Sequence, residues 1–539
     1  MIANTMQDFK LRCSTLIDHA AREHGTRPIV SIRADGNQND SCWRAVRGEA
    51  IQLAKALAGL GIARGDRVAT LAMNHAEHLA TWYGVMGVGA IVHTINPRLF
   101  DEQILYIINH AEDRILLYDA SFQPIIDRLR DRLTTVEHYI CFDSSEVERS
   151  FGNLIGAQDQ DFAWVDGDER EANMLCYTSG TTGNPKGVLY QHRSTVLHAM
   201  AEIQPAVFDF APASVILPVV PMFHAAAWGI PFAGAAVGAK LVLSATNDAA
   251  MLLDLMKREE VTHSAGVPTV WLSLLEHVEQ AGATLDDLKT VIVGGSAAPR
   301  EIVERFMRMG VRVSHAWGMT ETSPIGTMGA PSPDWRRRSF DEKVDLTLKQ
   351  GRTPFGVELR VVDEQGQDLP RDGQSAGRLL VRGAWVLQRY FKSDEDAVDD
   401  NGWFDTGDVA VIDGDGVLQL TDRAKDVIKS GGEWISSVEL ENSAISHPDI
   451  LEAAAIGAAH PKWGERPLLL IVPKPGRRPS EADVQQFLAQ RVAKWWVPEV
   501  ILLVKELPHT ATGKILKTEL RRQYVGYLVD NATAASKRD

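Results

Sequence analysis

Cysteine is scarce in this 539-residue sequence, and its scarcity restricts the class of protein. The four cysteines, Cys13, Cys42, Cys141 and Cys176, are scattered, and no two of them have the spacing of metal ligands. So few cysteines in so long a chain argue against a disulfide scaffold and favour a reducing, cytoplasmic location. We expect Cys176, which lies in an apolar segment, to be a buried strand residue.

Positive charge is also in short supply. Lys and Arg number 56 against 71 Asp and Glu, which leaves a formal net charge of -15. This balance argues against a surface that binds nucleic acid, so we expect no nucleic-acid partner. Hydrophobic residues make up 45% of the chain and charged residues 24%, as in an ordinary globular protein. A chain of this length is expected to form two or more domains.

Long hydrophobic runs are missing. The most apolar long stretch, residues 79–95, contains three glycines and one histidine, and it is better explained as helix, turn and strand than as a membrane span. The first residues lack a basic start followed by an apolar segment, so no signal peptide is expected. The sequence also shows no internal repeat and no low-complexity tract.

Strand-like and helix-like segments alternate through the first two-thirds of the chain. The expected strands are 67–73, 91–95, 261–265, 291–293 and 311–315, and the expected helices are 75–88, 268–278 and 300–309. This alternation predicts an α/β fold with parallel sheets covered by helices. Ligands of such folds collect at the carboxyl ends of the strands, where the glycine-rich segments of this chain also fall.

The pattern changes after Gly351. Short strands at 357–362, 377–381 and 409–412 alternate with Gly, Asp and Pro turns and predict a small β subdomain. The remainder holds expected helices at 438–446 and 481–493 and strands at 468–472 and 500–504. We therefore predict a large N-terminal domain over residues 1–422 and a small, mobile α+β domain over residues 423–539.

One loop carries most of the functional information. Residues 177–187, YTSGTTGNPKG, combine three glycines, hydroxyl side chains and Lys186 directly after an apolar segment. Glycines let successive N–H groups close around a phosphate, and the lysine adds a positive charge. The loop is not a Walker loop, because Pro185 precedes the lysine and Gly187-Val188 follows, so we expect a second strand in place of a helix. A plain Gly/Ser/Thr-rich surface hairpin is the alternative.

The loop resembles the phosphate loop of the acyl-adenylate-forming superfamily, which includes acyl- and aryl-CoA ligases, luciferases and adenylation domains. Further matching strings follow in the order of the family, at residues 294–299, 315–321, 403–408, 422–434 and 508–517. The strings HAWGM (315–319) and FHAAAWG (223–229) resemble the fatty-acyl-CoA ligase branch that includes 3-methylmercaptopropionate–CoA ligases.

The resemblance implies a site for ATP and Mg²⁺. Thr178 and Glu321 would serve the metal ion, since hard oxygen ligands suit Mg²⁺. Asp408 and Arg423 would hold the ribose, and Trp317, where many relatives carry tyrosine, would stack on adenine. The other residues implied in nucleotide binding are Ser179, Gly180, Thr181, Thr182, Gly183, Lys186, Gly294, Gly295, Ser296, Ala297, Pro299, His315, Ala316, Gly318, Met319 and Thr320.

The resemblance also implies two half-reactions in one active site. Lys514 would be a catalytic lysine that bridges the carboxylate and the α-phosphate, and Lys425 would be the hinge on which the small domain turns. Segment 429–434, with Lys429, Gly431, Gly432 and Trp434, would serve coenzyme A as co-substrate. His224, Trp228, Gly295 and Gly318 would line the pocket for the acid.

These features predict an ATP-dependent acid–CoA ligase. The expected substrate is a small-molecule carboxylic acid, a medium- or long-chain fatty acid, with a short-chain or 3-methylmercaptopropionate ligase as the alternative. Two other classes stay open: an adenylation enzyme that loads a separate carrier protein, and a non-catalytic nucleotide-binding regulator. The sequence does not decide between a monomer and a homodimer.

Overall fold

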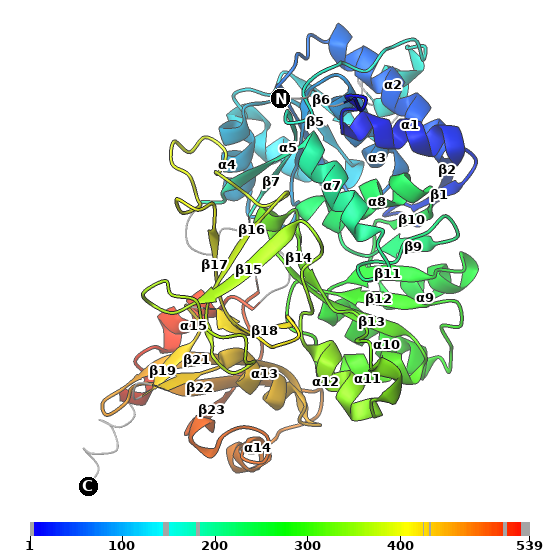
Figure 1. Ribbon diagram of the computed structural model, residues 1–539. Coiled ribbons are helices and arrows are strands. Elements are labelled where there is room, and N and C mark those ends of the chain that lie inside the picture. The colour runs from blue at the N-terminus through cyan, green and yellow to red at the C-terminus, as the bar shows by residue number, and fades with distance from the viewer. Residues whose placement is uncertain are drawn as a thin grey trace.

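The computed structural model describes residues 5–143, 150–178, 184–423, 425–430, 433–509 and 515–529. Most of it consists of two sheets whose helices cover their faces (Figure 1). The six-stranded sheet has the order β6-β5-β3-β4-β7-β8, parallel except for the last pair. Its strands are β3 (Arg67–Leu71), β4 (Ile91–Thr94), β5 (Asp113–Tyr118), β6 (His138–Cys141), β7 (Ala172–Tyr177) and β8 (Gly187–Gln191). The strand predicted after the phosphate loop is β8, which runs antiparallel to β7.

The second sheet has eight strands in the order β14-β13-β12-β11-β9-β10-β1-β2. Only the outer strands β2 and β14 are antiparallel to their neighbours. The strands are β1 (Pro28–Ile32), β2 (Gln38–Cys42), β9 (Val215–Pro218), β10 (Lys240–Ser244), β11 (His263–Gly266), β12 (Thr290–Val293), β13 (Arg312–Gly318) and β14 (Ile325–Met328).

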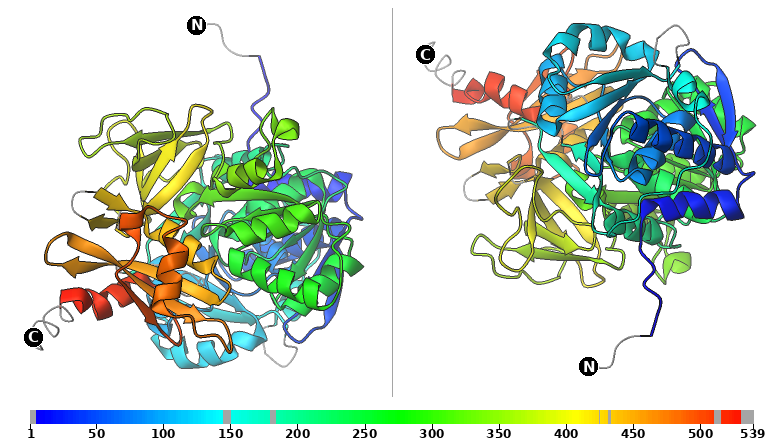
Figure 2. Two further views of the ribbon diagram at one scale, coloured as in Figure 1. Left: turned by 90° about the horizontal axis from the view of Figure 1, so that it is seen from below. Right: turned by 90° about the horizontal axis from the view of Figure 1, so that it is seen from above.

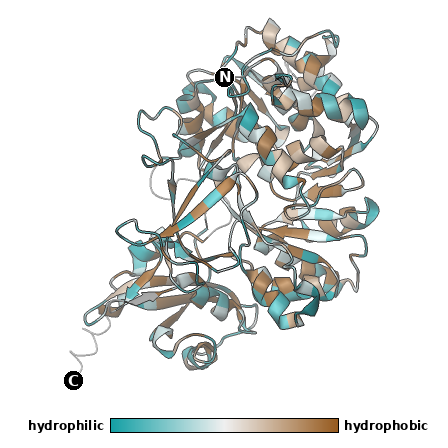
Figure 3. Ribbon diagram, in the orientation of Figure 1, coloured by the Kyte–Doolittle hydropathy of each residue, from teal (hydrophilic) through white to brown (hydrophobic). Residues whose placement is uncertain are grey.

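Twelve α-helices of the described residues accompany these two sheets. They are α1 (Cys13–Glu23), α2 (Trp43–Gly59), α3 (Ala76–Gly87), α4 (Asp101–Ala111), α5 (Gln123–Leu129), α6 (Phe151–Gly156), α7 (His192–Glu202), α8 (Ile230–Val237), α9 (Ala249–Arg258), α10 (Pro268–Gln280), α11 (Arg300–Arg308) and α12 (Phe340–Leu348). Helix α11 shows why they cover the sheet: Ile302, Val303 and Phe306 recur at helical spacing and are buried, while the other positions are mostly charged. Figure 3 shows the same division, with hydrophobic strands inside and hydrophilic residues on the outer helices.

The apolar stretch 79–95 forms most of α3 and all of β4. All residues of α3 except Glu77 are buried, which explains why the segment is apolar on every side. Among the described helices, none combines the length and the apolar character needed to cross a membrane.

The small β subdomain is a four-stranded antiparallel sheet of β15 (Val357–Val362), β16 (Gly377–Gly383), β17 (Phe404–Ile412) and β18 (Leu418–Arg423). A five-stranded sheet follows, made of β19 (Ile428–Ser430), β20 (Glu433–Ile435), β21 (Ile450–His460), β22 (Gly464–Pro473) and β23 (Val500–Leu503). It carries α13 (Ser437–Ile445), α14 (Glu481–Leu488) and α15 (Lys517–Tyr524). Figure 2 shows this C-terminal part beside the large N-terminal part.

The predicted fold class, a large α/β domain with parallel sheets and a small α+β domain, is confirmed. The boundary after residue 422 stays a prediction. One predicted helix is too long: residues 481–493 form a helix only to Leu488, because the N–H groups of Arg491 and Val492 both donate to the Leu488 carbonyl and turn the chain. Cys176 is a buried residue of β7, as expected.

Candidate active site

The carboxyl ends of strands from both large sheets meet around one cavity of about 90 Å³. Its lining residues follow β3 and β4 of the six-stranded sheet and β9 to β12 of the eight-stranded sheet. They are Met73, Asn74, Arg98, Val219, Val220, Pro221, Phe223, His224, Trp228, Ser244, Ala245, Thr246, Asn247, Val267, Val270 and Gly295. Three of the four residues predicted for the acid pocket, His224, Trp228 and Gly295, belong to this lining, whereas Gly318 does not.

Trp228 reaches the cavity from an unusual turn. Four successive non-glycine residues, Ala225 to Trp228, have φ between 43° and 56°, and Gly229 follows with φ 80°. This left-handed conformation costs an L-residue roughly 1–2 kcal/mol, so surrounding contacts must hold the turn in place. The Trp228 ring packs against Gly294, where an added β-carbon would lie 3.0 Å from it. The cavity therefore borders the predicted adenine segment.

A buried pair lies beneath the turn. A β-carbon at Gly229 would lie 2.5 Å from Glu202 Oε1 and 2.7 Å from His198 Nδ1, and those two atoms are 3.4 Å apart. His198 Nε2 accepts from the Ile325 N–H at 3.2 Å, so Nδ1 carries the ring proton. Burial lowers the pKa of His198 to about 3 and raises the pKa of Glu202 well above 4.5. Both side chains are therefore neutral.

We expect the neutral carboxyl group of Glu202 to make the free energy of unfolding depend on pH. In the unfolded chain Glu202 ionises near pH 4.5, while the folded chain keeps the proton, so stability falls as pH rises from there towards the raised folded pKa. Glu202→Gln removes this titration. The unfolding free energy of the variant should gain on the wild type by about 1.4 kcal/mol per pH unit in that window. Thermal denaturation of both proteins from pH 5 to 8 measures the slope, and a difference independent of pH would contradict the assignment.

The ends of the phosphate loop close on each other. The Thr178 N–H donates to the Lys186 carbonyl at 2.9 Å, and the Lys186 N–H donates to Thr178 Oγ1 at 3.2 Å. Five predicted phosphate contacts, Ser179, Gly180, Thr181, Thr182 and Gly183, lie outside the described residues.

Lys186 and Glu321 meet at Tyr390, a residue that the sequence analysis missed. The Tyr390 hydroxyl donates to Glu321 Oε1 at 2.8 Å, and Lys186 Nζ lies 4.7 Å from the centre of the Tyr390 ring. Glu321 is 7% exposed, and burial raises the pKa of its carboxyl group, against the effects of Tyr390, Arg423 and Lys186. A buried carboxylate of this kind gains free energy from a bound cation, so Glu321 fits the predicted magnesium role.

Trp317 and the predicted ribose residues form a second group. The Trp317 indole N–H donates to Asp408 Oδ2 at 2.9 Å, and Arg423 Nε lies 3.5 Å from Asp408 Oδ1. The Trp317 ring is 5% exposed and packs against Gly326 of β14. Trp317 lacks the hydroxyl group of the tyrosine that many relatives carry at this position. Its indole N–H nevertheless supplies a hydrogen bond to Asp408. Stacking of this ring on adenine stays a prediction.

The remaining residues of the two nucleotide motifs shape the backbone. His315 is buried in β13 and its Nδ1 faces the Leu348 carbonyl at 2.9 Å, and burial lowers its pKa. Gly318 allows close approach, because a β-carbon there would lie 1.8 Å from the Pro324 carbonyl oxygen. Ala316, Met319 and Thr320 continue this segment, and the Thr320 carbonyl accepts from the Tyr190 hydroxyl at 2.8 Å. Gly295, with φ 83°, and Ser296 are exposed, Ala297 is half-buried, and Pro299 is the N-cap of α11.

The predicted hinge lies between β18 and β19. The N–H groups of Asp426 and Val427 both donate to the Arg423 carbonyl, at 2.8 and 2.9 Å, and burial lowers the pKa of Lys425. Asp422 links β18 to α13 across this turn. Its Oδ2 accepts a hydrogen bond from the N–H of Ser437, the first residue of α13, at 2.6 Å. Lys429 and Trp434 pair in register in β19 and β20. Gly431, Gly432 and Lys514 lie outside the described residues.

Comparison with known proteins assigns the family. The AMP-binding enzyme family matches residues 17–391, and the AMP-binding enzyme C-terminal domain matches residues 439–514. The chain belongs to the AMP-binding enzyme family. This membership confirms the resemblance that the motifs indicated.

This chain is similar to acid–CoA ligases over nearly its whole length. It is 47% identical to a medium-chain-fatty-acid–CoA ligase of Ectopseudomonas oleovorans, over 99% of this chain and 100% of that one. It is also 47% identical to a 3-methylmercaptopropionyl-CoA ligase of Ruegeria lacuscaerulensis, over 95% and 97%. Its fold matches the crystal structure of the anthranilate CoA ligase AuaEII in complex with anthranoyl-AMP, with a TM-score of 0.86, 26% identity and coverage of 96% and 98%.

Proposed function

We propose that this AMP-binding enzyme is an ATP-dependent acid–CoA ligase. One observation carries the proposal: the cavity and the nucleotide motifs share Gly295, and Trp228 joins them by packing on Gly294. An acid held in the cavity therefore presents its carboxylate beside the nucleotide residues. The carboxylate oxygen forms a bond to the α-phosphorus of ATP as the bond to pyrophosphate breaks. The thiol of coenzyme A then loses its proton and attacks the acyl carbon, and AMP leaves.

The chain's own residues supply positioning and charge for these steps. Thr178 and Lys186 close the phosphate loop, and Lys186, whose Nζ lies over the Tyr390 ring, would balance phosphate charge. Asp408 has its carboxylate oriented by the Trp317 indole and by Arg423, as a group that accepts from ribose hydroxyls requires. Glu321 and Thr178 would hold Mg²⁺, which neutralises phosphate charge when bound.

The nature of the acid follows from the cavity wall. Val219, Val220, Phe223, Val267 and Val270 make much of the lining apolar, and Arg98 is the one lining residue among those described that carries a fixed positive charge. Such a wall suits an acid with an alkyl chain and no amino group. We therefore propose a medium- or long-chain fatty acid, with 3-methylmercaptopropionate as the alternative that a similar relative supports.

We expect a graded preference for chain length. Each methylene buried in an apolar cavity contributes roughly 0.8 kcal/mol, or about fourfold in kcat/KM, until the cavity ends. Trp228→Ala should shift the preferred acid to longer chains if the indole ring forms the floor. Rates with acids from propionate to palmitate test both points. Equal kcat/KM over that series, or a strong preference for benzoates, would contradict the fatty-acid proposal.

A second assay separates the enzyme classes. AMP release that depends on coenzyme A supports the ligase, whereas release only with a carrier protein supports a stand-alone adenylation enzyme. ATP–pyrophosphate exchange that stays silent with a broad panel of acids would support a nucleotide-binding regulator. We further propose a cytoplasmic location, which the four free cysteines favour, and a homodimer as one form to examine by light scattering.

A further inference from the structure

Asn74 connects the two large sheets beside the cavity. It follows β3 of the six-stranded sheet, is 2% exposed, and reaches the last residue of β9 of the eight-stranded sheet and the segment after it. Its Nδ2 donates to the carbonyls of Pro218 and Val220 at 3.1 and 3.0 Å, and its Oδ1 accepts from the Met222 N–H at 2.7 Å. One side chain thus satisfies three backbone groups of a segment that lies directly before Phe223 and His224.

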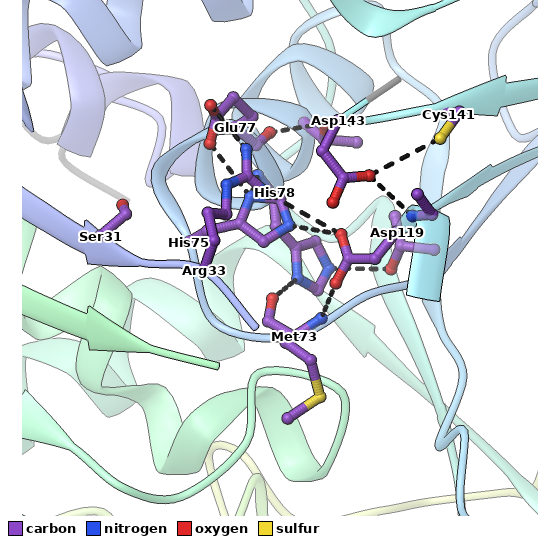
Figure 4. A network of polar contacts seen from close by, with 12 residues as sticks. Ser31, Arg33, Met73, His75, Glu77, His78, Asp119, Cys141 and Asp143 are labelled. Carbon is purple, nitrogen blue, oxygen red and sulfur yellow. Dashed lines mark hydrogen bonds and ion pairs between the residues drawn. The ribbon is translucent and has the colours of Figure 1, made fainter. Parts of the chain in front are cut away.

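The backbone next to Asn74 is itself fixed on both sides. The Met73 N–H donates to Asp119 Oδ2 at 2.8 Å, and His78 Nδ1 donates to the Met73 carbonyl at 2.9 Å (Figure 4). His78 Nε2 lies 2.9 Å from Thr70 Oγ1, which fixes the ring from the opposite edge. Burial lowers the pKa of His78 to about 3, so it stays a neutral donor to Met73.

An ionic cluster holds Asp119 in turn. His75 Nε2 lies 2.9 Å from Asp119 Oδ1, and Arg33 lies 2.7 Å from Glu77 and 3.9 Å from Asp119. Burial would lower the pKa of His75, but Asp119 and Glu77 outweigh it and raise that pKa. Figure 4 shows these side chains pointing toward one another, with Met73 at the edge of the group, where its backbone meets Asp119. The cluster keeps Asp119 in place, and through Met73 it keeps Asn74 in place.

We propose that Asn74 is a positioning residue for the acid: it holds the wall Pro218–Met222 against the six-stranded sheet and thereby sets where His224 and Phe223 stand in the cavity. This inference rests on the proposed ligase function and adds to it a residue that positions the acid pocket. Asn74, Val219, Val220 and Pro221 all line the cavity, whereas Asp408 and Glu321 do not, so a shift of this wall should change the room for the acid more than the nucleotide site.

Asn74→Ala tests the positioning role in the full-length enzyme. It leaves two buried carbonyls and one N–H without partners, so the wall should move and KM for the acid should rise about tenfold, with the chain-length profile flattened. KM for ATP should change less than twofold. Asn74→Asp distinguishes hydrogen bonding from packing: it keeps the shape but places an oxygen against two carbonyl oxygens. Its effect on KM for the acid should equal or exceed that of alanine, whereas a packing role predicts a milder effect.

Asn173→Ala is the matched control. Asn173 is fully buried in β7, and its Nδ2 lies 3.0 Å from Thr195 Oγ1 and 3.1 Å from Cys13 Sγ, outside the cavity lining. It should lower thermal stability without changing KM for the acid. Equal changes of KM in Asn74→Ala and Asn173→Ala, or no change in Asn74→Ala, would overturn the inference.

A measurement independent of activity separates this inference from the proposed function. Hydrogen exchange of the peptide covering residues 218–224 should be faster in Asn74→Ala, because the Met222 N–H loses its acceptor, and unchanged in Asn173→Ala. Unchanged exchange in Asn74→Ala would overturn the positioning role even in an active enzyme. Absence of acid-dependent pyrophosphate exchange in the wild type, beside faster peptide exchange in Asn74→Ala, would refute the ligase function alone.

Discussion

Glu321→Ala should reduce acyl-adenylate formation by at least ~100-fold. Burial already raises the pKa of this carboxyl group, so its negative charge is held in a place that favours a cation. A bound divalent ion stabilises developing charge by several kcal/mol, and loss of its protein ligand removes most of that effect. ATP–pyrophosphate exchange at several magnesium concentrations measures the result.

Glu321→Gln is the control for this prediction. Glutamine keeps an oxygen that accepts from the Tyr390 hydroxyl but carries no charge, so a merely structural role predicts recovery of activity. A role in holding magnesium predicts that glutamine is about as impaired as alanine. Wild-type turnover of Glu321→Ala at low magnesium would show that the assignment is wrong.

The motifs predicted the family because each is short, local and ordered along the chain. A motif of this kind can be recognised from residue types alone. The examples are the glycine and hydroxyl residues at 177–187, Asp408 and Arg423. The structure brings several of them together: Lys186 lies near Glu321 through Tyr390, and Arg423 lies near Asp408. Tyr390 was missed because a single tyrosine outside any helix or strand carries no local pattern, and only the folded chain brings it to Glu321.

Strand β21 shows where local preference fails. Its residues Ile450–His460 are rich in alanine, which favours helices, and the sequence predicted no strand there. In the structure Ala453, Ala454 and Ala455 are fully buried, and β21 pairs with β22 along nearly its whole length. Small side chains let helices and neighbouring strands pack closely on both faces, so tertiary contacts outweigh the intrinsic preference.

The left-handed turn at Ala225–Trp228 could not be predicted either. Alanine and tryptophan have no preference for positive φ, and nothing in the string FHAAAWG indicates one. The turn exists because Gly229 fits closely over Glu202 and His198, which lie on a helix more than 20 residues earlier in the chain. Contacts of this range carry no signal in a single sequence.

Lys514→Ala and Lys425→Pro should fail in opposite half-reactions. We propose that rotation of the small domain lets one site run two steps, with Lys514 facing ATP in the first and segment 430–434 replacing it in the second. Lys514→Ala should lose adenylate formation by about 100-fold or more, as when a preorganised charge is removed, yet still form thioester from a supplied acyl adenylate. Pyrophosphate exchange and thioester formation are measured separately for each variant.

Lys425→Pro should do the reverse, keeping pyrophosphate exchange and losing thioester formation. Proline fixes φ in the short turn between β18 and β19, where the N–H groups of Asp426 and Val427 converge on the Arg423 carbonyl. The hydrogen bond from the Ser437 N–H to Asp422 Oδ2, at 2.6 Å, then helps to hold the small domain near one orientation, because it joins residues on either side of the hinge. If both variants lost both half-reactions equally, with lowered thermal stability, a folding defect would explain them and the two-orientation mechanism would be refuted for this protein.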